Sequence, residues 1–377
     1  MASNAPQTTK STPSRAAFGR FFLPGPTEVR PEILAASARQ VIGHRGRAME
    51  ELIAGIQPRL KSVFRTTRPV YIATSSATGL MEGAIRNAVR RRVLCLVNGA
   101  FSERFFHIAR ACGVEADALE VPLGEGHTPE MLADALRRAD YDAVTVVHSE
   151  TSTGVLDPVA DLARVAHAAG DVVLLVDSVS GIAGLPVETD RWRLDFVLTG
   201  SQKALALPPG LAFGVAQPNV LERAKAQLGR GIYFDFVEFE RNILKNQTPN
   251  TPAVSLFYAL AAQLEAIERE TIEARWARHA AMARRTWEWV DEMQARGIAL
   301  EVLAPEGFRS PTVTCIRIPG GRSGSQITRT MKERGYVIAS GYGALKEATV
   351  RIGHMGDHTV GELDALLGEL ENVLRGE

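Results

Sequence analysis

Three polar segments of this chain carry side chains that could act together in chemistry, and the first contains Lys203. It lies in the segment SQKAL, between the apolar run DFVLTG and the stiff turn PPG. A lysine flanked by apolar residues at the end of a strand is costly unless its amine is used. Desolvation lowers the pKa of an ammonium, which lets the amine attack an aldehyde and later move protons. Taken alone, Lys203 could equally be a solvated lysine in a surface loop.

The second segment contains Asp177, which ends the apolar run VVLLV 26 residues before Lys203. A carboxylate at the mouth of a buried strand could hold a pyridine nitrogen protonated, which makes the ring of pyridoxal phosphate (PLP) an electron sink. A lysine amine and such a carboxylate together suit this cofactor. The alternative is that Asp177 only accepts backbone N–H groups of the following turn.

The third segment, TSSATG over residues 74–79, follows a short apolar run and precedes a helical stretch. Ser76, Ala77 and Thr78 would offer hydroxyl and free backbone N–H groups at a helix N-terminus, which suits a phosphate dianion. Ser and Thr are also the usual caps of helices that bind nothing. The segment is not a G-x-x-x-x-G-K-[ST] loop, and no G-x-G-x-x-G follows an early strand, so a nucleotide site is disfavoured.

Two further strand ends offer groups for a cofactor ring. The run RVLCLVNGAF brings Phe101 to a place where its ring could stack on a pyridine. The run VVHSETSTGV brings the hydroxyls of Thr151 and Thr153 within reach of a phenolic oxygen. Phe101 could equally be an ordinary core residue.

A sheet must position these residues, and the chain from about residue 50 to 260 predicts one. Short β-branched runs alternate there with amphipathic stretches. This rhythm indicates right-handed crossovers and a mostly parallel sheet covered by helices on both faces. Ligands of such sheets bind at the carboxyl ends of the strands. The candidate residues all follow runs that we predict as strands.

The rest of the chain indicates a second unit. From about residue 253 the apolar spacing becomes three and four, which predicts two long helices, and from about 299 shorter signals indicate a small α+β domain. We predict a large domain over 21–275 and a small domain over 276–377, because this length usually exceeds one core. Residues 1–20 hold no acid and predict a flexible tail. A transit peptide shares that composition, but Pro6 and Pro13 would break its helix.

The composition points to a small-molecule partner. The chain has 43 Lys plus Arg residues and 43 Asp plus Glu residues. It therefore has no net positive charge that would attract nucleic acid or an acidic membrane surface. The longest apolar runs are far below the ~20 residues that span a bilayer. The three cysteines lack C-x-x-C spacing, so neither a zinc site nor a redox pair is expected. We expect a soluble, cytoplasmic protein without a metal.

Taken in order, these segments resemble the class V aminotransferases of fold type I, particularly the alanine–glyoxylate and serine–glyoxylate (or serine–pyruvate) enzymes. The likeness runs from Phe22 to the C-terminus through LPGPTEVRPEIL, SSATG, HSETSTGVLDP, LLVDSVSG, TGSQKALALPPG, NTPAVSLFYAL and VRIGHMG. It implies an α/β fold with a large helix-covered sheet and a smaller C-terminal α+β domain. It also implies a PLP-dependent transaminase that moves an amino group from alanine or serine to glyoxylate or pyruvate by a ping-pong mechanism.

The resemblance implies a role for each matching residue. Lys203 would form the Schiff base and Asp177 would hold the ring nitrogen. Arg351 would bind the substrate carboxylate through a two-pronged pair, with Gly25 of the GPT segment also at the substrate. The other implied cofactor-binding residues are Ser76, Ala77, Thr78 and Gln202 at the phosphate, Phe101 and Val179 on the two ring faces, Thr151, and Thr251 from a neighbouring subunit.

The family is dimeric, so the resemblance implies a homodimer with shared active sites. Thr248 is a departure, because the alanine–glyoxylate and serine–glyoxylate members carry Tyr there. His44 and Arg45 resemble a His-Arg pair of members that take phosphoserine, aspartate or other substrates with an anionic side chain. Arg45 could therefore bind a second anion across the dimer, or it could lie exposed in a loop.

Two other functions compete with transamination. A cysteine desulfurase or another lyase of the same fold is the first, but a desulfurase needs a mobile thiol. Cys315 lies inside the apolar run TVTCIRIP and is predicted to be a buried strand residue. A non-catalytic binding protein that has kept the fold is the second. The intact set of Lys203, Asp177 and Arg351 argues against it.

Overall fold

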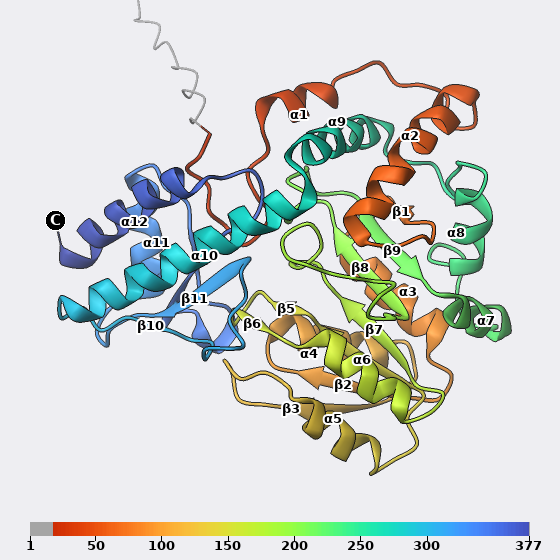
Figure 1. The fold of residues 1–377 in the computed structure, drawn as a ribbon, viewed down its shortest axis with the longest axis horizontal. Coiled ribbons are helices and arrows are strands. Elements are labelled where there is room, and N and C mark those ends of the chain that lie inside the picture. The colour runs from red at the N-terminus through yellow and green to blue at the C-terminus, as the bar shows by residue number, and fades with distance from the viewer. Residues whose placement is uncertain (1–17, 377) are drawn as a thin grey trace, which may run out of the picture.

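A seven-stranded sheet flanked by helices forms the larger part of the protein (Figure 1). The computed structural model describes residues 18–376, so residues 1–17 of the predicted tail lie outside the described residues. At the end of that tail, the backbone N–H groups of Gly19 and Arg20 donate to a carboxylate oxygen of Glu28, at 2.9 and 3.3 Å. Residues 19 and 20 are thus bonded to the folded protein.

The large sheet is mostly parallel, as predicted. Strand β9 pairs antiparallel with β1 and β8, and the other neighbouring pairs are parallel. Strands β4, β7, β8 and β9 are buried along their whole length, as expected of strands covered on both faces. The order across the sheet is β1 (Tyr71–Ala73), β9 (Ala212–Ala216), β8 (Phe196–Gly200), β7 (Val173–Asp177), β4 (Ala143–Val147), β2 (Arg92–Val97) and β3 (Glu115–Glu120).

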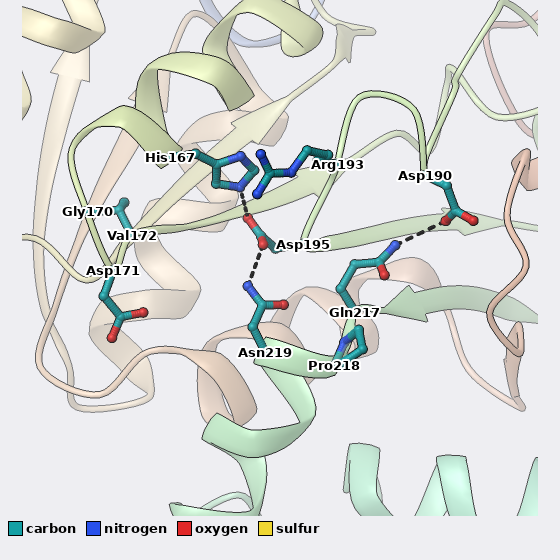
Figure 2. A pocket seen from close by; sticks show the side chains of 10 residues that line it. All are labelled: His167, Gly170, Asp171, Val172, Asp190, Arg193, Asp195, Gln217, Pro218 and Asn219. Carbon is teal, nitrogen blue, oxygen red and sulfur yellow. Dashed lines mark hydrogen bonds and ion pairs between the residues drawn. The ribbon is translucent and has the colours of Figure 1, made fainter.

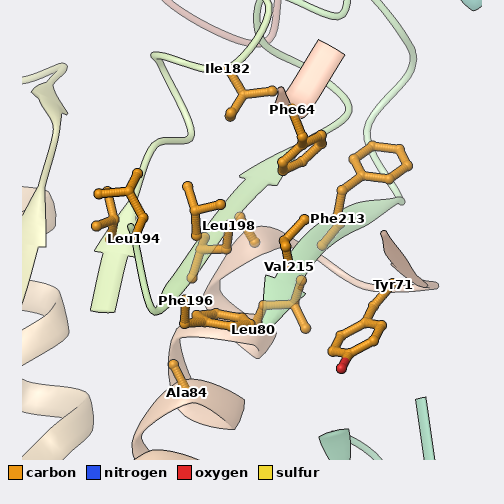
Figure 3. Packing of buried hydrophobic residues seen from close by; sticks show 14 of the residues in the cluster. Phe64, Tyr71, Leu80, Ala84, Ile182, Leu194, Phe196, Leu198, Phe213 and Val215 are labelled. Atoms are coloured by element: carbon orange, nitrogen blue, oxygen red, sulfur yellow. The ribbon is translucent and has the colours of Figure 1, made fainter. Parts of the chain in front are cut away.

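Helices between these strands pack their apolar faces on the sheet. Figure 3 shows the core on β8 and β9, where Phe196 and Phe213 lie among side chains of neighbouring elements. The ring of Phe196 stacks on that of Phe236, with centroids 4.6 Å apart. The helices of this part are α1 (Pro31–Ala36), α2 (Arg47–Phe64), α3 (Ala77–Ala88), α4 (Ala100–Ala111), α5 (Pro129–Leu136), α6 (Val159–Ala168), α7 (Pro218–Ala226) and α8 (Phe236–Ile243).

Two long helices lead to a second core. The two predicted helices are present as α9 (Val254–Glu270) and α10 (Ile272–Ala295). Helix α10 contributes Trp276 to the core of the large sheet and Trp289 to the second core, and it bridges the two parts in Figure 1. Phe22, near the start of the described chain, also belongs to the second core. The domain boundary at 275/276 stays a prediction.

The C-terminal part is the predicted small α+β unit. Its antiparallel sheet has the order β10 (Glu301–Val302), β11 (Val313–Arg317), β13 (Thr349–Gly353) and β12 (Ala339–Ser340). Helices α11 (Gly324–Glu333) and α12 (Val360–Arg375) accompany it, with the short 3-10 helix η1 (Gly343–Leu345). A two-stranded pair, β5 (Ser149–Glu150) and β6 (Val155–Leu156), follows β4. Within residues 18–376 there is no helix whose length and apolar character would let it cross a bilayer.

Candidate active site

One cavity of about 290 Å³ lies at the carboxyl edge of the parallel strands. Asp177 is the last residue of β7, Lys203 follows β8, and Phe101 follows β2 at the start of α4. Parallel strands bring such positions to one edge of the sheet. The structure places nine of the predicted cofactor-binding residues around this cavity: Ser76, Ala77, Thr78, Phe101, Thr151, Asp177, Val179, Gln202 and Lys203.

Lys203 is a buried amine, with 7% of the residue exposed. Its Nζ donates to the carbonyl oxygen of Pro24. Burial, and secondly the charge of Arg351, lower the pKa of Lys203 to about 8. Gly25 is required beside it, because its φ is +111° and a Cβ atom there would lie 2.5 Å from the Lys203 Nζ. An amine in this state is suited to nucleophilic attack.

The loop of Lys203 is held by the N-terminal segment of the chain. Thr27 donates its backbone N–H to the carbonyl of Gln202 at 2.9 Å and its hydroxyl to the carbonyl of Lys203 at 3.0 Å. From α10, the guanidinium of Arg275 donates to the carbonyl of Ala204 at 2.7 Å. These bonds fix the backbone from which the lysine side chain extends.

Asp177 is a buried carboxyl with few partners. It is 3% exposed, and one of its oxygens accepts the backbone N–H of Val179 at 2.8 Å. Burial, and to a smaller extent the charge of Glu150, raise the pKa of Asp177 to about 7, and the Val179 hydrogen bond opposes them. The sequence left open a purely capping role for Asp177. Within residues 18–376 this is the one hydrogen bond of the Asp177 side chain, which leaves capacity for a further proton donor in the cavity, such as a pyridine nitrogen.

The N-terminus of α3 has the free groups that a phosphate would need. Ser76 is its N-cap residue, yet its side chain makes no capping hydrogen bond, whereas Thr128, Ser323 and Thr359 do cap their helices. The buried hydroxyl of Ser75 has no hydrogen-bond partner within the described part of the chain. The first turn of α3 therefore presents unused N–H groups to the cavity, which suits a dianion.

The ring-binding residues lie beside these groups. The Nζ of Lys203 is 5.8 Å from the centroid of the Phe101 ring. Thr151 lines the cavity, with its hydroxyl 2.6 Å from that of Ser180. Thr153 is fully buried, and its hydroxyl donates to the carbonyl of Asn98 at 3.4 Å. Our expectation that Thr153 would also face the ring was therefore wrong.

Arg351 lies on β13 and is 8% exposed. It is not one of the residues that line the cavity, but it contacts Thr151, which does line it. Its guanidinium donates to the carbonyls of Ser340 and Thr151, at 2.9 and 3.1 Å. Among residues 18–376 no carboxylate forms an ion pair with it, and burial lowers its pKa. A buried guanidinium without an acidic partner is suited to an incoming carboxylate.

Arg45 and Thr251 do not reach the cavity within one subunit. The guanidinium of Arg45 donates to the carbonyls of Thr248 and Pro249, at 2.6 and 3.1 Å. Thr251 is exposed and lies with Thr248 at a separate surface hollow. Their predicted roles across a dimer stay predictions.

Five cavity residues were missed by the sequence reasoning: Met81, Arg104, Val147, Ser149 and Ser180. Arg104 lies three residues after Phe101 on α4, so helical spacing could have found it. Ser149 and Ser180 stand inside segments whose neighbours were chosen. Val147 is the last residue of β4, at the edge where ligands are expected.

A larger hollow of about 460 Å³ lies at the opposite, amino edge (Figure 2). Its residues come from the end of α6, from the turns before β7 and β8, and from the start of α7 after β9. Asp195 is its central buried group, and it accepts hydrogen bonds from His167 Nε2 at 2.9 Å, Leu174 N–H at 2.8 Å and Asn219 Nδ2 at 2.6 Å. A carboxylate with three donors is satisfied, so this hollow is the weaker candidate despite its size.

Known proteins share this fold and much of this sequence. The family model described as aminotransferase class-V matches residues 38–366. The serine–glyoxylate aminotransferase of Methylorubrum extorquens is 33% identical, over 89% of this chain and 86% of that protein.

Two solved structures share the fold over nearly the whole chain. An aspartate aminotransferase from Thermus thermophilus is 31% identical with a TM-score of 0.87, covering 95% of this chain and 99% of that one. An alanine–glyoxylate aminotransferase from Nostoc sp. is 28% identical with a TM-score of 0.88, covering 100% of both. The chain belongs to the class V aminotransferases. The predicted α/β architecture of fold type I and the predicted transaminase class are thereby confirmed.

Proposed function

We propose that this aminotransferase binds PLP in the carboxyl-edge cavity and moves an amino group from alanine or serine to glyoxylate or pyruvate by a ping-pong mechanism. The observation that carries the proposal is one cavity lined by a buried amine, Lys203, a buried carboxyl, Asp177, and the uncapped N-terminus of α3. These three features match the aldehyde, the ring nitrogen and the phosphate of PLP. The family is PLP-dependent, which agrees with this fit.

Lys203, Asp177 and Arg351 have separate roles in the proposed reaction, and the charge of each side chain determines its role. When bound, PLP supplies an electron sink for the negative charge that develops at the substrate Cα. The Lys203 amine, with a pKa of about 8, is partly unprotonated near neutral pH and can accept the Cα proton. Asp177 holds the proton at the ring nitrogen, and Arg351 orients the substrate through its carboxylate. A 2-oxo acid takes the amino group in the second half-reaction.

A donor with a small uncharged side chain is the proposed substrate. Serine–glyoxylate and alanine–glyoxylate aminotransferases are among the similar proteins, and so is an aspartate aminotransferase. An aspartate or phosphoserine donor would need a second cation in the site. Arg45 does not line the cavity of its own subunit, and its guanidinium donates to backbone carbonyls. Arg104 does line the cavity, so aspartate and phosphoserine are tested beside alanine and serine.

The proposed homodimer is supported by exposed apolar side chains in the segment 228–233, one of which, Tyr233, lines a hollow with Thr251. Leu228 is fully exposed, and Ile232 and Tyr233 are 85% and 43% exposed. Tyr233 and Thr251 line the same surface hollow, together with Thr74 of the phosphate segment. A second subunit covering these residues would lie close to the phosphate site. Sedimentation velocity should give a dimer, and a monomer with full activity would contradict the shared site.

The desulfurase alternative finds no suitable nucleophile at Cys315. Cys315 lies on β11 and is 1% exposed, so the prediction that it is a buried strand residue is confirmed. Burial raises the pKa of its thiol, which disfavours the reactive thiolate. Release of sulfide from cysteine would revive this alternative.

The test is the absorbance spectrum of the purified protein between about 300 and 500 nm. Alanine, serine, aspartate and phosphoserine are added separately, each without an acceptor. PLP joined to Lys203 is expected to absorb near ~420 nm, and pyridoxamine phosphate near ~330 nm. Loss of the first band with growth of the second would support the first half-reaction and identify the donor. No band after PLP is supplied would overturn the proposal.

A further inference from the structure

Glu150 is a buried carboxylate that the proposed mechanism does not use. It ends β5 and is 0% exposed. Among residues 18–376 no Lys, Arg or His forms an ion pair with it. A buried carboxylate is costly unless hydrogen-bond donors replace the water that it has lost. Its partners therefore indicate what it does.

Those donors come from the first turn of α4 and from Ser152. One oxygen of Glu150 accepts the backbone N–H groups of Phe101 and Ser102, at 3.1 and 2.9 Å. The other oxygen accepts the backbone N–H and the hydroxyl of Ser152, at 3.0 and 2.6 Å. Ser152 Oγ in turn accepts the backbone N–H of Ala100 at 3.0 Å. Glu150 and Ser152 thus satisfy all three N–H groups at the start of this helix.

This cap replaces the usual local one. The N-cap residue of α4 is Gly99, which has no side chain to offer. A Cβ atom on residue 99 would lie 2.5 Å from the Glu150 side chain, so a glycine is what lets the carboxylate approach. The negative charge also faces the positive end of the helix dipole. The cap comes from a segment about 50 residues away in sequence, and the residue that it holds is the predicted stacking residue, Phe101.

We propose that Glu150 is a positioning residue of the active site: it fixes the first turn of α4 so that the Phe101 ring is held against the cofactor ring. This inference rests on the proposed binding of PLP. The carboxylate also lies close enough to the catalytic groups to act on them. Its charge raises the pKa of Asp177 and opposes the lowering of the pKa of Lys203. Arg351 and Arg104 are the cations that act on the same groups.

The test compares Glu150→Gln with the wild-type protein and with Glu120→Gln, an exposed carboxylate that ends β3. The amide keeps the size but removes the charge, and its NH2 group must face one pair of donors. PLP is titrated into the apoprotein while the tryptophan fluorescence is followed. We expect the Kd for PLP to rise by about tenfold or more in Glu150→Gln, and to stay unchanged in Glu120→Gln.

A second readout separates positioning from a general loss of structure. In the PLP-loaded protein, the midpoint of the pH dependence of the visible band should move to lower pH in Glu150→Gln, because a nearby negative charge no longer favours the protonated lysine. Glu150→Asp keeps the charge and should leave this midpoint near that of the wild type. A wild-type Kd and midpoint in Glu150→Gln would overturn the proposal.

If Glu150→Gln does not fold, Ser152→Ala replaces it in the PLP titration. This variant removes only the hydroxyl that joins Glu150 to Ala100. It should weaken PLP binding in the same direction but less, and a wild-type Kd there would count against the proposal. The proposed function fails separately, because the wild-type protein itself would then show no saturable change with PLP. Wild-type binding with unaffected variants would reject the role of Glu150 alone.

Discussion

Two buried aspartates at opposite edges of the large sheet differ in their hydrogen-bond partners. Asp177 at the carboxyl edge and Asp195 at the amino edge are 3% and 4% exposed. Asp195 accepts hydrogen bonds from His167, Leu174 and Asn219, whereas Asp177 accepts one from Val179. Similar burial thus accompanies a fully hydrogen-bonded carboxylate at one edge and a carboxyl group with free hydrogen-bonding capacity at the other. The number of partners, not burial, separates them.

The topology helps to explain why polar groups with free hydrogen-bonding capacity lie at the carboxyl edge. Helices α3 and α4 begin there, after β1 and β2, so their N–H groups and positive dipole ends face that side. Helix α7 also begins at the amino edge, with Gln217 as its N-cap residue. The hollow there is, however, lined by side chains that hydrogen-bond one another, such as His167, Asp195 and Asn219 (Figure 2). The contrast can be tested by removing groups at each edge in turn.

Lys203→Ala should give the largest effect. The amine is the proposed nucleophile and proton carrier, so the transamination rate should fall at least about 10³-fold. The rate is measured with alanine or serine as donor and glyoxylate as acceptor. Lys225→Ala, which removes an exposed lysine of α7, is the control and should keep the wild-type rate. An undiminished rate in Lys203→Ala would remove the lysine from the chemistry.

Asp177→Asn should lower activity by about 10²-fold and yet stabilise the apoprotein. The amide cannot hold a ring nitrogen protonated, which weakens the electron sink. The pKa of Asp177 is raised to about 7 in the folded protein, so the native state binds the extra proton between about pH 4 and 7. The free energy of unfolding therefore falls as pH rises through that window. Above pH 7 the folded protein bears the whole cost of a charged, buried carboxylate.

This stability effect separates Asp177 from an ordinary buried acid. Above pH 7 the Asn variant should be more stable by about 1–3 kcal/mol, and the difference should shrink toward pH 4. Urea unfolding of the apoproteins at pH 5 and pH 8 measures it. Destabilisation at both pH values would mean that Asp177 is a satisfied group like Asp195.

Arg351→Lys should reduce kcat/KM for the amino acid by about 10–100-fold. Lysine keeps the charge but loses the planar pair of donors that a carboxylate can bind. The loss should fall on the amino acid and not on the cofactor, so the Kd for PLP is the internal control. Equal kcat/KM values in the two proteins would place the substrate carboxylate elsewhere.

Asp195→Asn should have the smallest effect on catalysis. Its NH2 group must face one of the present donors, which costs about 1–3 kcal/mol of stability. Activity at 25 °C should stay near that of the wild type. Loss of activity in a folded Asp195→Asn protein would mean that the amino edge takes part in function, and the contrast between the two edges would be lost.

Parts of the site could be predicted because they depend on local pattern. Asp177 and Lys203 each follow an apolar run, and strand ends of a parallel sheet converge at one edge. Thr151 and Thr153 show the limit of such reasoning. They stand two residues apart in one segment, but Thr151 lines the cavity whereas the hydroxyl of Thr153 donates to the carbonyl of Asn98. Sequence spacing does not say how a turn is oriented.

By itself, the sequence determined the alternation of strands and helices, the two cores and the chemical types at the strand ends, because these depend on periodicity and on burial along single elements. Tertiary structure alone decided which polar groups keep free capacity. Lys203 donates to Pro24, 179 residues away, and Glu150 accepts from the amides of Phe101 and Ser102. Such partners come from distant segments of the chain. Neither composition nor spacing could therefore show that the Glu150 carboxylate is fully hydrogen-bonded while the Asp177 carboxyl keeps free hydrogen-bonding capacity.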